Sequence, residues 1–154
     1  MKLLNLGAGN RLLTGAEGDT VINHDIVKHR KEINCVWDLN VTPWIWEADY
    51  FDAIEFISTI EHLLINPIQA LDQCWRILKK GGILTIKYPL VTSDTIWDDP
   101  THTRFMTEKS LDYVIPGTRY GEDYSFYSLC KWERLDGGII KGRNYKARLS
   151  PIKD

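Results

Sequence analysis

The chain has 154 residues, enough for one domain with a hydrophobic core and little room for a second. Hydrophobic residues make up 44% and charged residues 26%, as is ordinary for a soluble globular protein. The formal net charge of -2 gives no overall attraction to nucleic acid or to an anionic membrane. No apolar run reaches membrane-spanning length, and we expect no signal peptide.

The chain opens with a short apolar run, Leu3–Leu6, that breaks into Gly7-Ala8-Gly9. This pattern predicts a buried parallel strand and then a tight turn, where glycine admits unusual backbone angles and lets a ligand approach. Nucleotide-like cofactors bind at such a turn when it follows the first strand of an α/β sheet. A second strand is predicted at Thr20–His24, so the connection Gly7–Gly18 holds one or two helical turns at most.

Further strands are predicted at Ile33–Trp37, Phe51–Ile57 and Ile83–Tyr88. The clearest helix is predicted over Pro67–Lys80, because Asn66 can cap it and Gly81 can end it. Strands that alternate with helices favour a Rossmann-like, doubly wound α/β fold with a mostly parallel sheet and abbreviated early helices. We expect this fold to form a single domain over residues 1–154.

After Pro89 the sequence no longer shows the regular alternation of predicted strands and helices. The polar segment Val91–Met106 is predicted as a loop over the site, and Thr107–Val114 as a short helix, with a second loop at Pro116–Ser125. Trp132–Leu135 and Asn144–Leu149 are predicted as a pair of antiparallel strands joined through Gly137-Gly138.

The cysteines are too few and too far apart in the sequence to form a framework of disulfides. Cys35, Cys74 and Cys130 are odd in number, and none belongs to a Cys-x-x-Cys pair. This usage favours buried thiols in a reducing, cytoplasmic compartment and argues against disulfides or a zinc site.

Five short pieces follow one another along the chain. They are Asn5-Leu6-Gly7-Ala8-Gly9, Asn23-His24-Asp25, Trp37-Asp38-Leu39-Asn40, Phe51-Asp52-Ala53-Ile54 with Thr59-Ile60-Glu61-His62, and Leu78-Lys79-Lys80-Gly81-Gly82. In this order they resemble the class I S-adenosylmethionine-dependent methyltransferases, and more narrowly the compact group with a Leu-Asn-Leu-Gly-x-Gly opening. The resemblance covers Lys2 to about Tyr113.

The resemblance implies S-adenosylmethionine as the cofactor. Gly7, Ala8 and Gly9 would turn backbone N–H groups toward its carboxylate end, much as such turns receive phosphates. Asn5 stands where many relatives have an acid near the methionine part, and an amide there both donates and accepts.

Two acids follow the second and third predicted strands. The resemblance implies that Asp25 accepts from the ribose hydroxyls, and that Asp38 and Leu39 face the adenine. The alternative for both acids is a structural one, in which they end strands or cap turns.

The loop Asp98–Phe105 resembles a motif that follows the fifth strand in this group. His102 could take a proton from an oxygen or nitrogen nucleophile, because a histidine pKa lies near working pH. Arg104 could hold an anionic substrate group, or it could pair with Asp99 and hold the loop. A metal ion at Asp98, Asp99 and His102 lacks a supporting His or Cys cluster, so we expect no metal site.

Three more residues are candidates for the methyl-transfer site. His62 resembles a histidine that borders it in many relatives, with a packing role as the alternative. Tyr88 and Trp97 are expected to form an aromatic rim, which suits a cationic methyl donor.

The nearest rival cofactors fit less well. A nicotinamide dehydrogenase needs glycine or alanine where Leu12 stands, and no Gly-Lys-Ser/Thr follows the turn as a P-loop requires. The expected function is methyl transfer to an oxygen or nitrogen of a small molecule, a sugar or a nucleotide, with no membrane partner and no indication of nucleic acid. The alternative is a non-catalytic cofactor-binding module or a partner subunit of an active methyltransferase.

Overall fold

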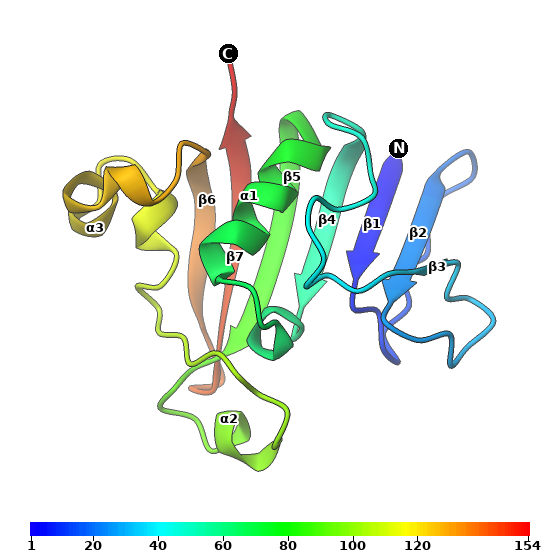
Figure 1. Ribbon diagram of the computed structural model, residues 1–154, viewed down its shortest axis with the longest axis horizontal. Helices are drawn as coiled ribbons and strands as arrows, with labels where there is room; N and C mark the ends of the chain where they lie inside the picture. Colours follow the sequence, from blue (N-terminus) through cyan, green and yellow to red (C-terminus); the bar gives the residue numbers. More distant parts are fainter.

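A seven-stranded sheet runs through the protein in the order β3-β2-β1-β4-β5-β7-β6 (Figure 1). The computed structural model describes residues 1–154. The strands are β1 (Lys2–Leu6), β2 (Thr20–Asp25), β3 (Cys35–Val36), β4 (Phe51–Ile57), β5 (Leu78–Pro89), β6 (Lys131–Ile140) and β7 (Asn144–Ile152). The first five pair in parallel, and β7 lies antiparallel between β5 and β6. The predicted Rossmann-like sheet with an antiparallel C-terminal pair is confirmed.

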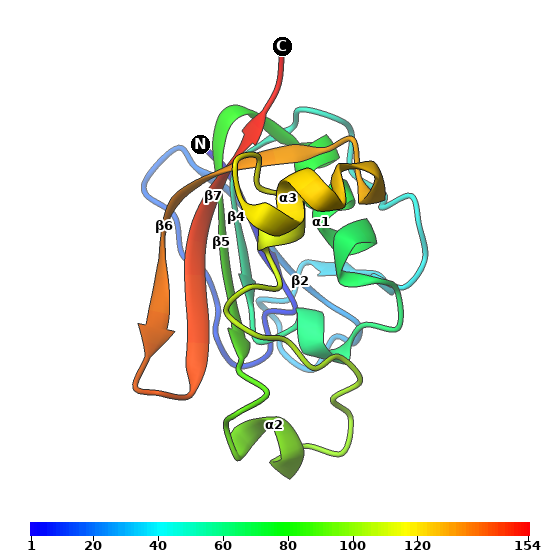
Figure 2. The same cartoon turned by 90° about the vertical axis from the view of Figure 1, so that its left-hand side faces the viewer.

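The helices are few and short. They are α1 (Pro67–Ile77), α2 (Thr95–Asp98) and α3 (Arg119–Asp123), with 3₁₀ turns η1 (Ile60–His62), η2 (Asp112–Val114) and η3 (Ser125–Tyr127). No helix connects β1 to β2, β2 to β3 or β3 to β4, so the early helices are missing rather than shortened. Figure 2 shows α1 and α3 on the same side of the sheet.

The core lies between this side of the sheet and α1. Along β5, Leu84, Ile86 and Tyr88 are fully buried, while the alternate positions between them are half-buried. This alternation is what a strand shows when one face packs on a helix and the other meets solvent. The helix contributes Ala70, Leu71, Cys74 and Ile77 to the same core.

Helix α1 begins as the sequence predicts and ends earlier. Leu78 leaves the helix with extended backbone angles and pairs with Phe51 in the sheet. Lys79, expected in the last helical turn, instead forms an ion pair with Asp52 at 2.6 Å. Pairing in the sheet and the complete burial of Leu78 outweigh the local helical pattern.

Two other predictions after Pro89 need correction. Gly137-Gly138 lies inside β6 rather than in the turn between β6 and β7, which falls at Lys141-Gly142. A Cβ at Gly137 would lie 2.5 Å from the hydroxyl oxygen of Tyr145, so glycine there makes room for a tyrosine on the neighbouring strand. The helix predicted at Thr107–Val114 shrinks to η2, and the loop predicted at Pro116–Ser125 contains α3.

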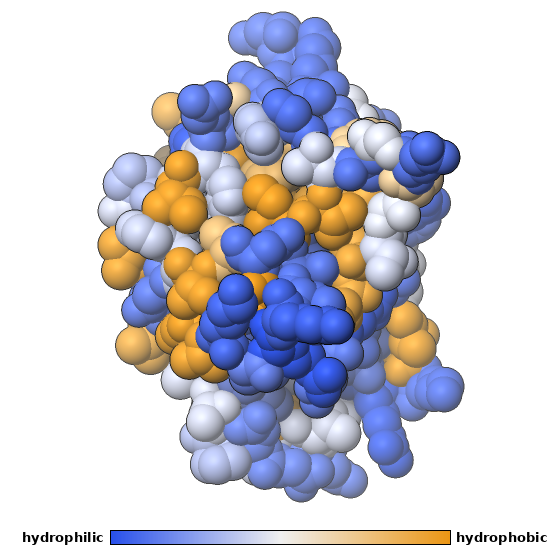
Figure 3. All heavy atoms as spheres, turned by 90° about the vertical axis from the view of Figure 1, so that its right-hand side faces the viewer, coloured by the Kyte–Doolittle hydropathy of each residue, from blue (hydrophilic) through white to orange (hydrophobic).

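Loops cover the end of the sheet that carries β2 and β3. Figure 3 looks onto this side and shows hydrophobic areas beside hydrophilic ones. Val27, Val36 and Val41 are among the exposed apolar side chains of this part of the chain. No helix of the protein is both long enough and apolar enough to cross a membrane.

Candidate functional site

A pocket of about 290 Å³ opens at the carboxyl ends of the parallel strands. The strand order reverses between β1 and β4, and an open α/β sheet binds ligands at such a switch point. The residues that line the pocket come from the ends of β1, β2, β3 and β4 and from η1. They are Gly7, His24, Asp25, Ile26, Trp37, Asp38, Leu39, Asn40, Ser58, Thr59, His62 and Leu63.

The backbone N–H groups of the glycine turn point into the protein. Gly7 N–H donates to His24 Nδ1 at 3.3 Å, Ala8 N–H to the His24 carbonyl at 2.8 Å, and Gly9 N–H to Asp25 Oδ2 at 2.8 Å. The expectation that these groups face the cofactor is therefore wrong for this structure. Because they already have partners, they form no cradle for a phosphate.

Glycine is required at position 7 by its neighbours. Gly7 has a φ of 62°, and a Cβ on it would lie 2.3 Å from Thr59 Oγ1. Thr59 in turn donates to the Leu6 carbonyl at 3.1 Å. The turn therefore packs directly against the segment that follows β4, and Gly7 and Thr59 both line the pocket.

His24 links the turn to the third strand, and sequence reasoning did not single it out. Its Nε2–H donates to the Trp37 carbonyl at 2.9 Å, which leaves Nδ1 free to accept from Gly7 N–H. Burial lowers the pKa of His24 below its ordinary value, so the ring is neutral. The sequence signal for this linking role of His24 is a histidine at a strand position that faces the interior.

Two carboxylates, Asp25 and Asp38, line the pocket together with apolar side chains. Asp25 accepts from Gly9 N–H and, through Oδ1, from Ile26 N–H at 2.7 Å. Asp38 Oδ1 accepts from the backbone and side-chain N–H groups of Asn40 at 2.9 and 3.0 Å. A carboxylate has about four acceptor positions, so both acids keep capacity for a ligand.

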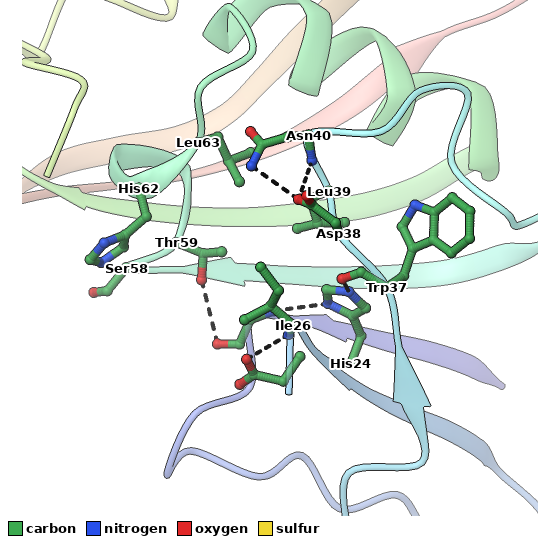
Figure 4. A pocket seen from close by; sticks show the side chains of 12 residues that line it. His24, Ile26, Trp37, Asp38, Leu39, Asn40, Ser58, Thr59, His62 and Leu63 are labelled. Carbon is green, nitrogen blue, oxygen red and sulfur yellow. Dashed lines mark hydrogen bonds between the residues drawn. The ribbon is translucent and has the colours of Figure 1, made fainter. Parts of the chain in front are cut away.

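The shape of the pocket leaves these groups facing a common space. Ile26 is 58% exposed although it is aliphatic, and it lies against the space beside Asp25. In Figure 4, His62 and Ser58 lie on one side of the pocket and Trp37 and His24 on the other.

This lining fits S-adenosylmethionine better than a dinucleotide. No lysine or arginine lines the pocket, so nothing there would neutralise a pyrophosphate. The two acids accept hydrogen bonds, as ribose hydroxyls and an adenine amino group require, and Ile26 offers an apolar surface for a base.

Asn5 does not line the pocket. It is buried, and its Nδ2 donates to the Arg11 carbonyl at 2.7 Å and to Asn23 Oδ1 at 2.9 Å. The expected contact with the methionine part is thus replaced by an anchor for the chain that leaves the glycine turn. Ala8 and Gly9 also lie outside the lining, whereas Gly7, Asp25, Asp38 and Leu39 belong to it.

The two predicted catalytic histidines meet beside the pocket. The rings of His62 and His102 have centroids 4.6 Å apart, and His62 lines the pocket while His102 lies behind it. Burial lowers the pKa of His62, and the neighbouring His102 acts in the same direction. Glu61 is buried next to them, and this burial raises the pKa of its carboxyl to about 7.

Arg104 holds the loop rather than facing the pocket. Its guanidinium donates to the carbonyls of Leu63 and Leu64, with the Nε contact to Leu63 at 3.0 Å. The backbone N–H groups of Thr103 and Arg104 both donate to the Glu61 carbonyl. These bonds hold the loop against η1, and Arg104 donates to backbone carbonyls there and does not pair with Asp99.

The predicted aromatic rim is not formed as expected. Tyr88 is fully buried on the helix side of the sheet, where its hydroxyl donates to the Thr107 carbonyl at 3.0 Å. Trp97 is exposed on α2 and stacks on Phe105 with centroids 4.8 Å apart. Strand alternation turns Tyr88 into the core, because Leu84 and Ile86 face the same way.

A family model described as a methyltransferase domain matches residues 27–86. The match includes Asp38, Leu39 and the segment Thr59–His62, and it begins beyond Asp25. No curated protein sequence matches the chain.

Solved methyltransferase structures share the fold over nearly the whole chain. One is a SAM-dependent methyltransferase from Archaeoglobus fulgidus, 15% identical, with 97% of this chain and 85% of that chain covered and a TM-score of 0.62. Another, from Aquifex aeolicus, is 13% identical over 99% and 82%, with a TM-score of 0.62. A methyltransferase from Haloferax volcanii in complex with the Trm112 activator is 13% identical over 97% and 81%, with a TM-score of 0.63. At these identities the likeness shows the fold.

The strand order and the position of the pocket are those of the fold that these solved S-adenosylmethionine-dependent methyltransferases share. The middle of the chain, residues 27–86, matches a methyltransferase domain.

Proposed function

We propose that the protein is a class I S-adenosylmethionine-dependent methyltransferase that methylates an oxygen or nitrogen atom of a small acceptor, of the size and chemistry of a sugar or a nucleotide. The observation that carries the proposal is that His62 lines the same pocket as Asp25 and Asp38, with no lysine or arginine among the lining residues. Groups that can hold the cofactor and a group that can accept a proton therefore lie in one pocket.

Each acid of the pocket has a proposed role toward the cofactor. Asp25 would accept from the ribose hydroxyls, Asp38 from the adenine amino group, and Leu39 would contact the base beside Ile26. When bound, S-adenosylmethionine supplies a methyl group on a positively charged sulfur. The chain then has to align the acceptor, exclude water and remove a proton.

His62 and His102 are proposed to remove that proton. His62 borders the pocket, and His102 is held behind it by a hydrogen bond from its Nδ1 to the Ile96 carbonyl at 2.8 Å. Trp97 follows Ile96 directly, and its exposed ring with Phe105 offers a flat surface on which a sugar or base can pack. Selectivity is proposed to come from the segments 90–107 and 116–127.

Cofactor binding is the first test. Calorimetric titration with S-adenosylhomocysteine should show one site, and Asp25→Asn and Asp38→Asn should each weaken it about tenfold, the effect expected of one lost charged hydrogen bond. Asp136→Asn is the matched control, because Asp136 pairs with Arg148 on β6 and β7 away from the pocket. Absence of binding to the folded wild-type chain at about millimolar ligand would refute the proposal.

The second test is transfer itself. A screen of hydroxyl-bearing and amine-bearing sugars and nucleosides with a labelled methyl donor should find an acceptor. His62→Gln should lower the rate with a smaller effect on S-adenosylhomocysteine affinity. Cofactor binding without transfer to any small acceptor would instead support the non-catalytic alternative, which the present findings do not favour.

A further inference from the structure

The proposed proton-removing histidines belong to a group of three metal-ligand types. Glu61, His62 and His102 each place one potential ligand atom within 4.8 Å of the other two. Two of these residues are adjacent in η1, and the third comes from the loop after β5. The fold therefore brings the imidazole of His102 next to the carboxylate of Glu61 and the imidazole of His62, which lie about 40 residues earlier in the chain.

The hydrogen bonds of the two rings leave the same atom open on each. His102 Nδ1 faces the Ile96 carbonyl, which only accepts, so Nδ1 carries the hydrogen and Nε2 keeps its lone pair in the neutral ring. Thr101 donates its hydroxyl hydrogen to Asp99 Oδ1 at 2.6 Å and so must accept from His62 Nδ1 at 2.9 Å. His62 Nε2 is then also open.

These partners are the kind that orient metal-binding histidines. A ligating histidine usually donates its second ring N–H to a carboxylate, a backbone carbonyl or a water. His102 has a backbone carbonyl, that of Ile96, and His62 reaches the Asp99 carboxylate through the Thr101 hydroxyl. Asp99 Oδ2 also lies 3.8 Å from His102 Nε2 and adds negative charge beside the group.

Glu61 supplies a second, independent observation that points to a ligand. The residue is only 2% exposed, and its Oε2 has no hydrogen-bond partner. An unpartnered carboxylate oxygen is costly to bury, and a bound cation is one of the few ways to satisfy it. Ligand atoms of one ion lie roughly 3 Å apart, so a separation of at most 4.8 Å leaves only a small movement for these side chains to make on binding.

We propose that Glu61, His62 and His102 bind a divalent first-row transition-metal ion at the edge of the cofactor pocket. Two imidazoles and one carboxylate suit zinc, cobalt or manganese better than magnesium, and three protein ligands leave positions open for an acceptor. This revises the expectation from sequence that the chain has no metal site.

With both Nε2 atoms bound to the ion, the histidines would act through the metal and would not take the proton themselves; this role replaces their direct proton removal and rests on the proposed methyl transfer. A hydroxyl group in contact with the ion would lose its proton to solvent more readily. The acceptor oxygen then forms its bond to the methyl carbon while the sulfur–carbon bond breaks and leaves its electron pair on sulfur. The acceptor class narrows to a hydroxyl group, as in a sugar or ribose.

The test starts with metal binding alone. The untagged, chelator-treated chain is titrated with Co²⁺, and visible absorbance is followed. One equivalent should bind with the bands of a protein-coordinated ion, Zn²⁺ should displace it, and Mg²⁺ should not. Glu61→Gln and His102→Gln should lose the one-equivalent signal, and Thr101→Val should weaken it by about tenfold.

Matched controls separate this site from ordinary surface binding. Glu55→Gln and His29→Gln change the same residue types outside the group and should bind Co²⁺ as wild type does. Circular dichroism checks that each variant is folded. Lack of stoichiometric Co²⁺ binding, or equal binding by wild type, Glu61→Gln and His102→Gln, overturns the metal site.

The outcome for the metal is distinguishable from the outcome for the proposed function. S-adenosylhomocysteine affinity is measured on the same chelated sample. Cofactor binding without Co²⁺ binding refutes the metal site alone, and loss of both refutes both proposals. Methyl transfer at an undiminished rate in the chelated, metal-free protein would overturn the role of the ion in activating a hydroxyl.

Discussion

His24 shows how a single residue can hold a pocket together without facing a ligand through its ring nitrogens. One ring nitrogen accepts from the glycine turn and the other donates to the segment after β3. Only the neutral ring can do both, because a protonated ring has two donors and no acceptor. Protonation therefore breaks the link to Gly7.

This arrangement predicts that His24 lowers the stability in mild acid, whereas Glu61, whose pKa is raised by burial, contributes in the opposite direction. Because burial lowers the folded pKa of His24 below the ordinary 6.5, the unfolded chain binds a proton that the folded chain does not. The stability is present above about pH 6.5 and is lost as the pH falls through the lower folded pKa. Urea unfolding at about pH 7.5 and about pH 5.5 measures the difference.

The same experiment on variants isolates the residue. Between about pH 7.5 and about pH 5.5 the free energy of unfolding of His24→Gln should change more favourably than that of wild type, because the variant lacks the contribution of His24 and keeps that of Glu61. The pKa of His62 is lowered as well, so His62→Gln should remove its own share and leave that of His24. An identical change in wild type and His24→Gln would contradict the assignment.

Among the elements, α1 has the start that the sequence predicts most clearly. Asn66 Oδ1 accepts from Ile68 N–H at 2.8 Å, and Gln69 Oε1 accepts from Asn66 N–H at 3.1 Å. Pro67 occupies the first helical position, where no N–H is needed. These local interactions made the beginning of the helix predictable from spacing alone.

Asn66→Ala should lower the free energy of unfolding by about 1 kcal/mol, the usual cost of losing such a cap. Asn66→Asp is the matched control, because it keeps the acceptor oxygen and places negative charge at the helix N-terminus. Urea unfolding checks both variants. Equal destabilisation by Ala and Asp would show that the cap contributes nothing.

The end of α1 illustrates what local patterns miss. Gly81 and the cations before it are typical of a helix end, yet the chain enters β5 at Leu78. The partner that decides this, Phe51, lies on β4 and is distant in sequence. Gly137-Gly138 was misread for the same reason, because its neighbour Tyr145 comes from another strand.

At the scale of the whole molecule, the early strand connections lack the helices that such connections usually supply. The connections after β1, β2 and β3 are loops, and these loops build most of the pocket. Figure 2 shows α1 and α3 together on one side of the sheet. A pocket made from loops has few contacts of its own, so its ligand is expected to contribute to order there.

S-adenosylhomocysteine should therefore stabilise the folded chain. At a concentration about 100 times its Kd, the free energy of unfolding should rise by about 2.7 kcal/mol, because the ligand binds only the folded state. Urea unfolding with and without ligand measures the gain, and NAD serves as the control that should give none. A comparable gain with NAD would contradict the cation-free interpretation of the pocket.

The sequence by itself determined the early strands and their parallel arrangement, the start of α1 and the acids at or after the ends of β2 and β3. These features depend on neighbours in the chain, on apolar runs, caps and strand ends. Only the tertiary structure decided that the glycine turn donates inward, that Asn5 and Tyr88 face away from the pocket, and that Glu61 lies unpaired beside two histidines. Those outcomes depend on which strands and loops meet across the fold, and contacts between distant residues leave no periodic signal in the chain.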